Sequence, residues 1–140
     1  DMVSYHSWHR YVHDKYITDC YLIITCDKIM KPSSAKAKGR LLQKWFANLL
    51  VEELDVDPED LESRPMGSGG EDIIMGKQTR NIFPYSIECK NQEAVNVWKA
   101  YEQATENCKG YEPLVVIKRN RSKPLVVMDA EAFVRLHDKT

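Results

Sequence analysis

Apolar residues recur at spacings of three and four along residues 35–54, which is the spacing of one face of an α-helix. The positions are Leu41, Leu42, Trp45, Phe46, Leu49, Leu50 and Leu54. Ser33 or Ser34 can cap this helix at its N-terminus. A similar pattern predicts a second helix that is capped by Asn91, ends at Asn107 and packs through Val95, Val97, Trp98, Tyr101 and Ala104. Asp129 is expected to cap a third helix over residues 130–137.

Residues 84–90 alternate between apolar and polar side chains, the pattern of a half-buried β-strand. Ser86, Glu88 and Lys90 should share one face of this strand. Residues 61–64 and 72–75 are expected to form two earlier short strands, and the β-branched runs 114–117 and 125–128 to form two later buried strands. The order helix, three strands, helix, two strands, helix predicts an α/β fold.

The length of 140 residues, with 43% apolar and 29% charged residues, is typical of a single globular domain. Residues 30–140 are expected to form this domain, and residues 1–29 a peripheral extension whose role the sequence does not indicate. We expect no membrane segment and no signal peptide, and therefore a cytoplasmic location. The four cysteines lack close-paired spacing, which favours reduced thiols.

Histidines at helical spacings near the start of the chain offer one candidate metal site. His6, His9 and His13 are followed by Cys20 and Cys26, and together they could bind Zn²⁺. Their spacings match no familiar zinc module, and the neighbouring aromatic residues favour plain packing instead.

The formal net charge of −1 conceals two basic segments separated by an acidic one. The first basic segment spans residues 31–44, the acidic segment spans residues 52–62, and the second basic segment spans residues 118–123. Such segments are either solvated surface or contacts for a polyanion, because local charge sets the field that a partner meets.

Asp72 heads the strand that is expected to fold back against residues 84–90, which would bring it next to Glu88. Two carboxylates with the ammonium of Lys90 nearby can hold a hard divalent cation and activate a water molecule for phosphodiester hydrolysis. A solvent-facing Glu88–Lys90 ion pair without chemistry is the alternative, and the spacing leaves both open.

Four local features together resemble the PD-(D/E)xK nuclease superfamily, and among its members small phage endonucleases and Holliday junction resolvase-like proteins. The features are Lys38-Gly39-Arg40 with Gln43; residues 68–73 (SGGEDI); Glu88-Cys89-Lys90; and residues 98–104 (WKAYEQA) followed by residues 116–121 (VIKRNR). The resemblance spans residues 31–136. It implies the restriction-endonuclease-like fold, an α-β-β-β-α-β-β core with a central mixed sheet flanked by helices.

The resemblance also implies a catalytic site. Asp72 and Glu88 would be ligands of Mg²⁺ or Mn²⁺, with the backbone carbonyl of Cys89 as a third oxygen. Lys90 would orient or deprotonate the attacking water, or stabilise charge on the phosphate. Many relatives carry a glutamate on the first helix where this chain has Gln43, and a neutral amide adds no charge to the site. This departure leaves the number of metals open.

The resemblance implies DNA as the partner, with branched DNA such as Holliday junctions as the substrate, a homodimer to cut two strands, and the host cytoplasm as the location if the protein is phage-encoded. Basic residues would contact the phosphates without reading sequence. The expected DNA contacts are Lys36, Lys38, Arg40, Ser68, Gln103, Lys118, Arg119, Arg121 and Lys123. The alternative function, which Gln43 favours, is a non-catalytic DNA-binding protein that retains the fold.

Overall fold

The computed structural model describes residues 35–65 and 68–138. The predicted domain boundary between residues 29 and 30, the cap at Ser33 or Ser34, and the His6–Cys26 candidate zinc site lie outside the described residues.

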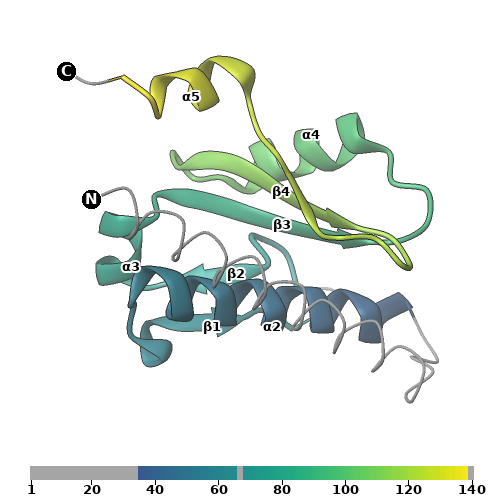
Figure 1. Ribbon diagram of the computed structural model, residues 1–140, viewed down its shortest axis with the longest axis horizontal. Helices are drawn as coiled ribbons and strands as arrows, with labels where there is room; N and C mark the ends of the chain where they lie inside the picture. Colours follow the sequence, from purple (N-terminus) through teal and green to yellow (C-terminus); the bar gives the residue numbers. More distant parts are fainter. Residues whose placement is uncertain (1–34, 66–67, 139–140) are drawn as a thin grey trace, which may run out of the picture. The chain divides into compact units, whose positions relative to one another are not determined.

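The elements follow one another in the predicted order, with one short extra helix and one 3₁₀ turn (Figure 1). They are α2 (Ala35–Leu54), η1 (Pro58–Asp60), β1 (Leu61–Ser63), β2 (Ile73–Met75), α3 (Lys77–Ile82), β3 (Tyr85–Asn91), α4 (Val97–Asn107), β4 (Glu112–Lys118), β5 (Leu125–Val127) and α5 (Ala130–Arg135). The residues expected to connect β2 to β3 as a loop contain α3. The α/β class is thus confirmed.

The strands form two ladders instead of one continuous sheet. β1 and β2 pair antiparallel, with Leu61 opposite Met75. The other ladder is a three-stranded mixed sheet in which β3 lies parallel to β4 and β4 lies antiparallel to β5. Just before β2, the N–H of Asp72 donates to the carbonyl of Ile87 in β3 at 2.8 Å. The mixed sheet is present, but the predicted single sheet is divided at this point.

The sheet is covered on both faces, by α2 on one side and α4 on the other (Figure 1). The larger core cluster joins α2 and β2 to one face of β3 and β4, through Leu42, Phe46, Leu50, Val56, Ile73, Met75, Tyr85, Ile87, Cys89, Leu114 and Val116. A smaller cluster packs Ala100 and Ala104 of α4 on Val115. β3 is therefore buried on both faces, whereas its alternating sequence predicted a half-buried strand.

Several predicted packing positions are exposed. Leu41 is 54% exposed because its neighbour Leu42 takes the core-facing position of α2. Trp98 is 83% exposed, since α4 packs through its alanines. α4 also begins later than expected: Asn91 still belongs to β3, and Asn96 caps the helix by accepting a hydrogen bond from the N–H of Lys99 at 3.1 Å.

The C-terminal elements differ from the prediction in extent and burial. Asp129 caps α5 as predicted, by accepting a hydrogen bond from the N–H of Ala132 at 2.9 Å. The helix ends at Arg135 instead of residue 137. β5 forms the edge of the three-stranded sheet, and its Leu125 and Val126 are exposed instead of buried.

The carboxylate of Asp60 fixes the start of α3. One of its oxygens accepts hydrogen bonds from both the N–H and the hydroxyl of Thr79, each at 2.7 Å, which lowers the pKa of Asp60. The N–H of Gly76 donates to the Asp60 carbonyl at 2.8 Å. A Cβ at Gly76 would lie 1.7 Å from the other carboxylate oxygen, so only glycine fits against the capping group.

We therefore expect Gly76→Ala to destabilise the protein by about 1–3 kcal/mol, the usual range for overpacking a filled site. The added methyl group would displace Asp60 from Thr79. Gly69→Ala is the matched control, because a Cβ there meets no atom within 4 Å. Thermal unfolding followed by circular dichroism checks both, and equal melting temperatures for the two variants would contradict the assignment.

Candidate functional site

Asp72 lies against the edge of β3 that faces away from β4. Its N–H donates to the Ile87 carbonyl, and one of its carboxylate oxygens accepts a hydrogen bond from the N–H of Cys89 at 2.7 Å. This bond holds the Asp72 carboxylate next to Cys89, which lies between Glu88 and Lys90 in the strand. The predicted proximity of Asp72 to Glu88 is confirmed, through these two bonds instead of a strand ladder.

The orientation of Cys89 decides whether its backbone carbonyl or its thiol could serve as a metal ligand. In an extended strand the N–H and the carbonyl of one residue point to the same side. Because the N–H of Cys89 points to Asp72, its carbonyl lies on that same edge. Burial raises the pKa of the Cys89 thiol well above its ordinary value, and the charges of Asp72 and Glu88 add to this effect. The thiol belongs to the core, as expected, and the backbone oxygen is the candidate donor.

Glu88 and Lys90 form an ion pair, with 2.7 Å between the Lys90 Nζ and the Glu88 Oε1. Glu88 is only 3% exposed, so the alternative of a solvent-facing pair is wrong. Lys90 also donates to the Oε1 of Gln103 on α4 at 2.9 Å. Its ammonium is thus fixed between a strand and a helix.

Gln43 reaches the same site from α2 and is buried. Its Oε1 accepts a hydrogen bond from the hydroxyl of Ser63 at 2.8 Å, and its amide lowers the pKa of Asp72. Five side chains predicted for this region therefore lie together, those of Asp72, Glu88, Lys90, Gln43 and Gln103. Sequence reasoning missed Ser63, because a serine at the end of a three-residue strand carries no distinguishing pattern.

Burial raises the pKa of both carboxylates. For Asp72, desolvation is the largest cause and raises the pKa. The N–H of Cys89, the charges of Lys90 and Arg64, and the amide of Gln43 lower the pKa, but they do not cancel the effect of desolvation. For Glu88, desolvation is again the largest cause; the hydrogen bond from Lys90 lowers the pKa and the charge of Asp72 raises it. Two desolvated, mutually repelling carboxylates are the electrostatic arrangement that a bound cation relieves.

A divalent cation at this site would have two carboxylates and one backbone carbonyl as protein ligands. Within residues 35–65 and 68–138, no group of three or more His, Cys, Asp or Glu side chains could hold a metal. The two carboxylates and the Cys89 carbonyl are all oxygen donors, which suits Mg²⁺ or Mn²⁺. Mg²⁺ also commonly binds through one or two carboxylates and retains several waters. These residues fit such an ion.

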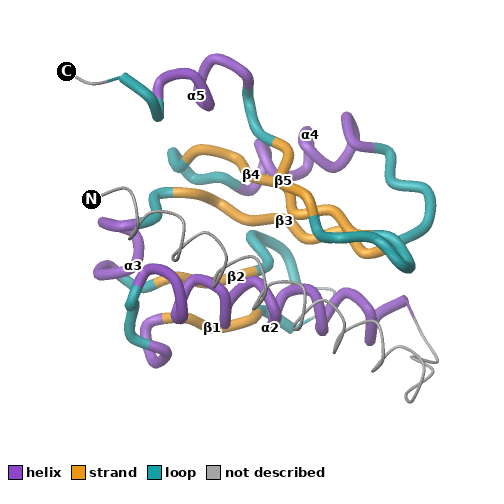
Figure 2. Tube along the Cα trace, in the orientation of Figure 1, coloured by secondary structure: helices purple, strands orange, loops and turns teal. Residues whose placement is uncertain are grey.

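The start of α2 and the loop between β4 and β5, which both carry basic residues, lie at the end of the sheet where β3 and β4 finish (Figure 2). The Lys38 Nζ donates to the Oδ1 of Asn120 at 2.9 Å, which joins α2 to the β4–β5 loop. The side-chain amide of Asn91 donates to the Lys38 carbonyl at 3.1 Å, and the N–H of Asn120 donates to Glu93 at 2.8 Å. We call Lys36, Lys38, Arg40, Arg119, Arg121 and Lys123 the basic surface.

Lys118 does not belong to the basic surface. It is the last residue of β4 and only 8% exposed, and its Nζ donates to the Arg119 carbonyl at 3.3 Å. Its predicted contact with a phosphate stays a prediction. Ser68 is exposed, and its hydroxyl donates to the Pro65 carbonyl at 2.6 Å. Its role toward DNA stays a prediction, as does that of Gln103.

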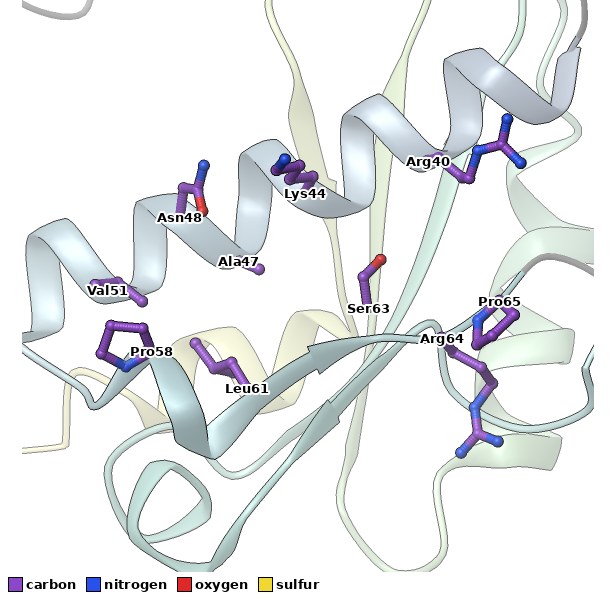
Figure 3. A pocket seen from close by; sticks show the side chains of 10 residues that line it. All are labelled: Arg40, Lys44, Ala47, Asn48, Val51, Pro58, Leu61, Ser63, Arg64 and Pro65. Atoms are coloured by element: carbon purple, nitrogen blue, oxygen red, sulfur yellow. The ribbon is translucent and has the colours of Figure 1, made fainter.

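An open groove of about 380 Å³ lies between α2 and the strand β1 (Figure 3). It is lined by Arg40, Lys44, Ala47, Asn48, Val51, Pro58, Leu61, Ser63, Arg64 and Pro65. The groove shares Ser63 with the site, and Arg40 with the basic surface. The Nε of Arg64 donates to the carbonyl of Glu71, the residue before Asp72, at 2.7 Å. Arg64 therefore connects the wall of the groove to the site. Arg64 was not among the residues predicted from the sequence.

Glu71 forms a buried ion pair with Arg80 of α3. Arg80 also donates to the Tyr85 carbonyl at 2.6 Å and lies over the ring of Tyr111, 4.1 Å from its centroid. This network holds the start of β3 and the residue adjacent to Asp72 in place. The acid nearest in sequence to Asp72 is therefore structural.

Comparisons with known proteins gave no match: no family model, no curated protein and no solved structure is similar to this chain. Across the part of the chain that the structure describes, none of the helices has the length and apolar character that a bilayer crossing requires.

We expect Glu88→Gln to raise the melting temperature at pH 7 in EDTA. Because the folded state raises the pKa of Glu88 above its ordinary value of 4.5, stability falls as the pH rises through and above that value. The glutamine removes this penalty and still offers Lys90 an acceptor, for a gain of about 0.5–2 kcal/mol.

The gain should disappear below about pH 4, where Glu88 is protonated in both the folded and the unfolded state. Glu106→Gln on the exposed side of α4 is the matched control and should change nothing. Thermal melts at pH 7 and at about pH 3, below the ordinary pKa of the glutamate, check both variants. A lower melting temperature of Glu88→Gln at pH 7 would contradict the pKa assignment.

Proposed function

We propose that this protein is a metal-dependent DNA endonuclease that hydrolyses phosphodiester bonds, with branched DNA as its substrate. The observation that carries the proposal is the hydrogen bond from the Cys89 N–H to the Asp72 carboxylate, which holds Asp72 between Glu88 and Lys90. This arrangement is the one that the resemblance to PD-(D/E)xK nucleases implies for its two acids and its lysine. The restriction-endonuclease-like fold is part of the same proposal, supported by the element order and by the mixed sheet between α2 and α4.

Asp72, Glu88 and the carbonyl of Cys89 would hold Mg²⁺ or Mn²⁺. When bound, the ion supplies positive charge for the phosphate in the transition state and acidifies water. Lys90, fixed by Glu88 and Gln103, orients the attacking water or stabilises charge on the phosphate. Gln43 would support the site by donating a hydrogen bond to Asp72, whose pKa its amide lowers.

The basic surface is the proposed contact for the DNA backbone. It lies at the end of β3 that carries Lys90, because Asn91 bonds directly to α2 at Lys38. Contacts with phosphates position a duplex without reading its sequence, which suits a nuclease that recognises branching. A homodimer would supply the two sites needed to cut two strands.

The catalytic proposal predicts that cleavage of a plasmid and of a synthetic four-way junction requires Mg²⁺ and stops in EDTA. Glu88→Ala and Lys90→Ala should each lower the rate at least about 100-fold, because each removes a group that acts on the reacting atoms. Gel electrophoresis of the products measures the rates. Glu106→Ala and Lys77→Ala, exposed residues on α4 and α3, are the matched controls and should cleave normally.

The same experiment tests the second candidate function, a non-catalytic DNA-binding protein, which the neutral Gln43 favours. Binding of the junction without nicking in any lane would support that alternative and overturn the catalytic proposal. Faster cleavage of the junction than of an unbranched duplex of the same length would support branched DNA as the substrate.

The basic surface should make junction binding strongly dependent on salt. Arg40→Ala combined with Arg119→Ala removes one cation from each basic segment. The slope of log K against log[salt] should become shallower by about 0.9 for each phosphate that the variant no longer neutralises. Fluorescence anisotropy in EDTA, at several salt concentrations, measures the slope without cleavage. An unchanged slope, equal to that of the Lys77→Ala control, would exclude these residues from the interface.

A further inference from the structure

The amide of Gln43 has a defined orientation. Its NH₂ end is the end that can donate to the carboxylate of Asp72, whose pKa the amide of Gln43 lowers. The opposite end, Oε1, accepts the hydrogen bond from the hydroxyl of Ser63 at 2.8 Å. Gln43 is only 1% exposed, so water cannot readily replace either partner.

We propose that Ser63 is a positioning residue that holds Gln43 as a hydrogen-bond donor to Asp72, and that the site consequently takes a single divalent cation. The inference rests on the proposed function. The Gln43 oxygen is turned toward β1 and bound there, so it is not available as a ligand.

The charges of the neighbouring residues agree with one cation. Asp72 and Glu88 together supply two negative charges, and the ion pair with Lys90 already offsets part of the Glu88 charge, so the site carries no surplus negative charge for a second divalent ion. The next acid along the chain, Glu71, is held by Arg80 and does not serve as a third carboxylate. Gln43 itself contributes a neutral donor, so it adds no third charge that a second ion would need.

Binding of Mn²⁺ to the full chain, without DNA, tests the metal count. Electron paramagnetic resonance of free Mn²⁺ should show one ion bound per wild-type chain, and two per Gln43→Glu chain, because the substitution adds a third carboxylate. Gln43→Ala should keep one ion but lower the affinity about tenfold, as removal of a group that orients a ligand usually does. Two ions per wild-type chain would overturn the inference.

The side-chain amide resonance of Gln43 tests the orientation without any metal. In the wild-type protein one amide proton should be protected from exchange by Asp72, and it should remain so when Mg²⁺ is added. Ser63→Ala should remove the protection, and Ser63→Thr, which keeps the hydroxyl, should restore it. Exchange that becomes fast on adding Mg²⁺ to the wild type would show that the oxygen turns to the ion, and would overturn the inference.

The two measurements separate this inference from the proposed function. A wild-type chain that binds no Mn²⁺ would overturn the nuclease proposal and the metal count together, while the protected amide would still decide the role of Ser63. A single bound ion with an unprotected amide would leave the nuclease proposal in place and overturn the role of Ser63.

Discussion

The hydrogen bond between the Cys89 N–H and the Asp72 carboxylate is the interaction on which both the fold and the candidate site depend. Together with the bond from the Asp72 N–H to Ile87, it is where β2 meets β3. The Asp72 carboxylate is also the group that is proposed to bind the metal ion. A variant at Asp72 therefore changes the junction of the sheets and the site together, whereas one at Lys90, which is partly exposed, reports more directly on chemistry.

The burial of β3 between α2 and α4 explains why the pKa values of Asp72 and Glu88 are raised. α2 and α4 bury a strand that carries a glutamate, and burial without compensation is unfavourable for a charge. Lys90 compensates part of the Glu88 charge, and the amides of Cys89 and Gln43 compensate part of the Asp72 charge. The pKa of each acid nevertheless remains raised, because desolvation by burial is the largest cause for both.

Much of the fold could be predicted from the sequence, because apolar periodicity over residues 35–54 and the short β-branched runs depend on local pattern alone. Tertiary context decided the rest. The alternation along residues 84–90 assigns Glu88 and Ser86 to a polar face, yet α4 covers them. The helical spacing assigns Trp98 to a packing face, yet alanines bring α4 close to the sheet and leave the indole outside.

For the candidate site, spacing and resemblance were enough to select Asp72, Glu88, Lys90, Gln43 and Gln103. They could not reveal partners that only the folded chain brings near, such as Ser63 with Gln43, twenty positions apart. They also could not show that Lys118 is buried, because a charge at the end of a strand looks the same in a sequence whether its side chain is buried or exposed.

The exposed edge strand β5 has a consequence for association between molecules. An open strand edge with apolar side chains such as Leu125 and Val126 invites pairing with another chain. β5 is only three residues long, and Lys123 and Pro124 directly precede it. Proline cannot donate to a ladder and lysine resists burial, so a foreign strand would find little backbone to pair with. The sequence thereby limits unwanted aggregation at this rim.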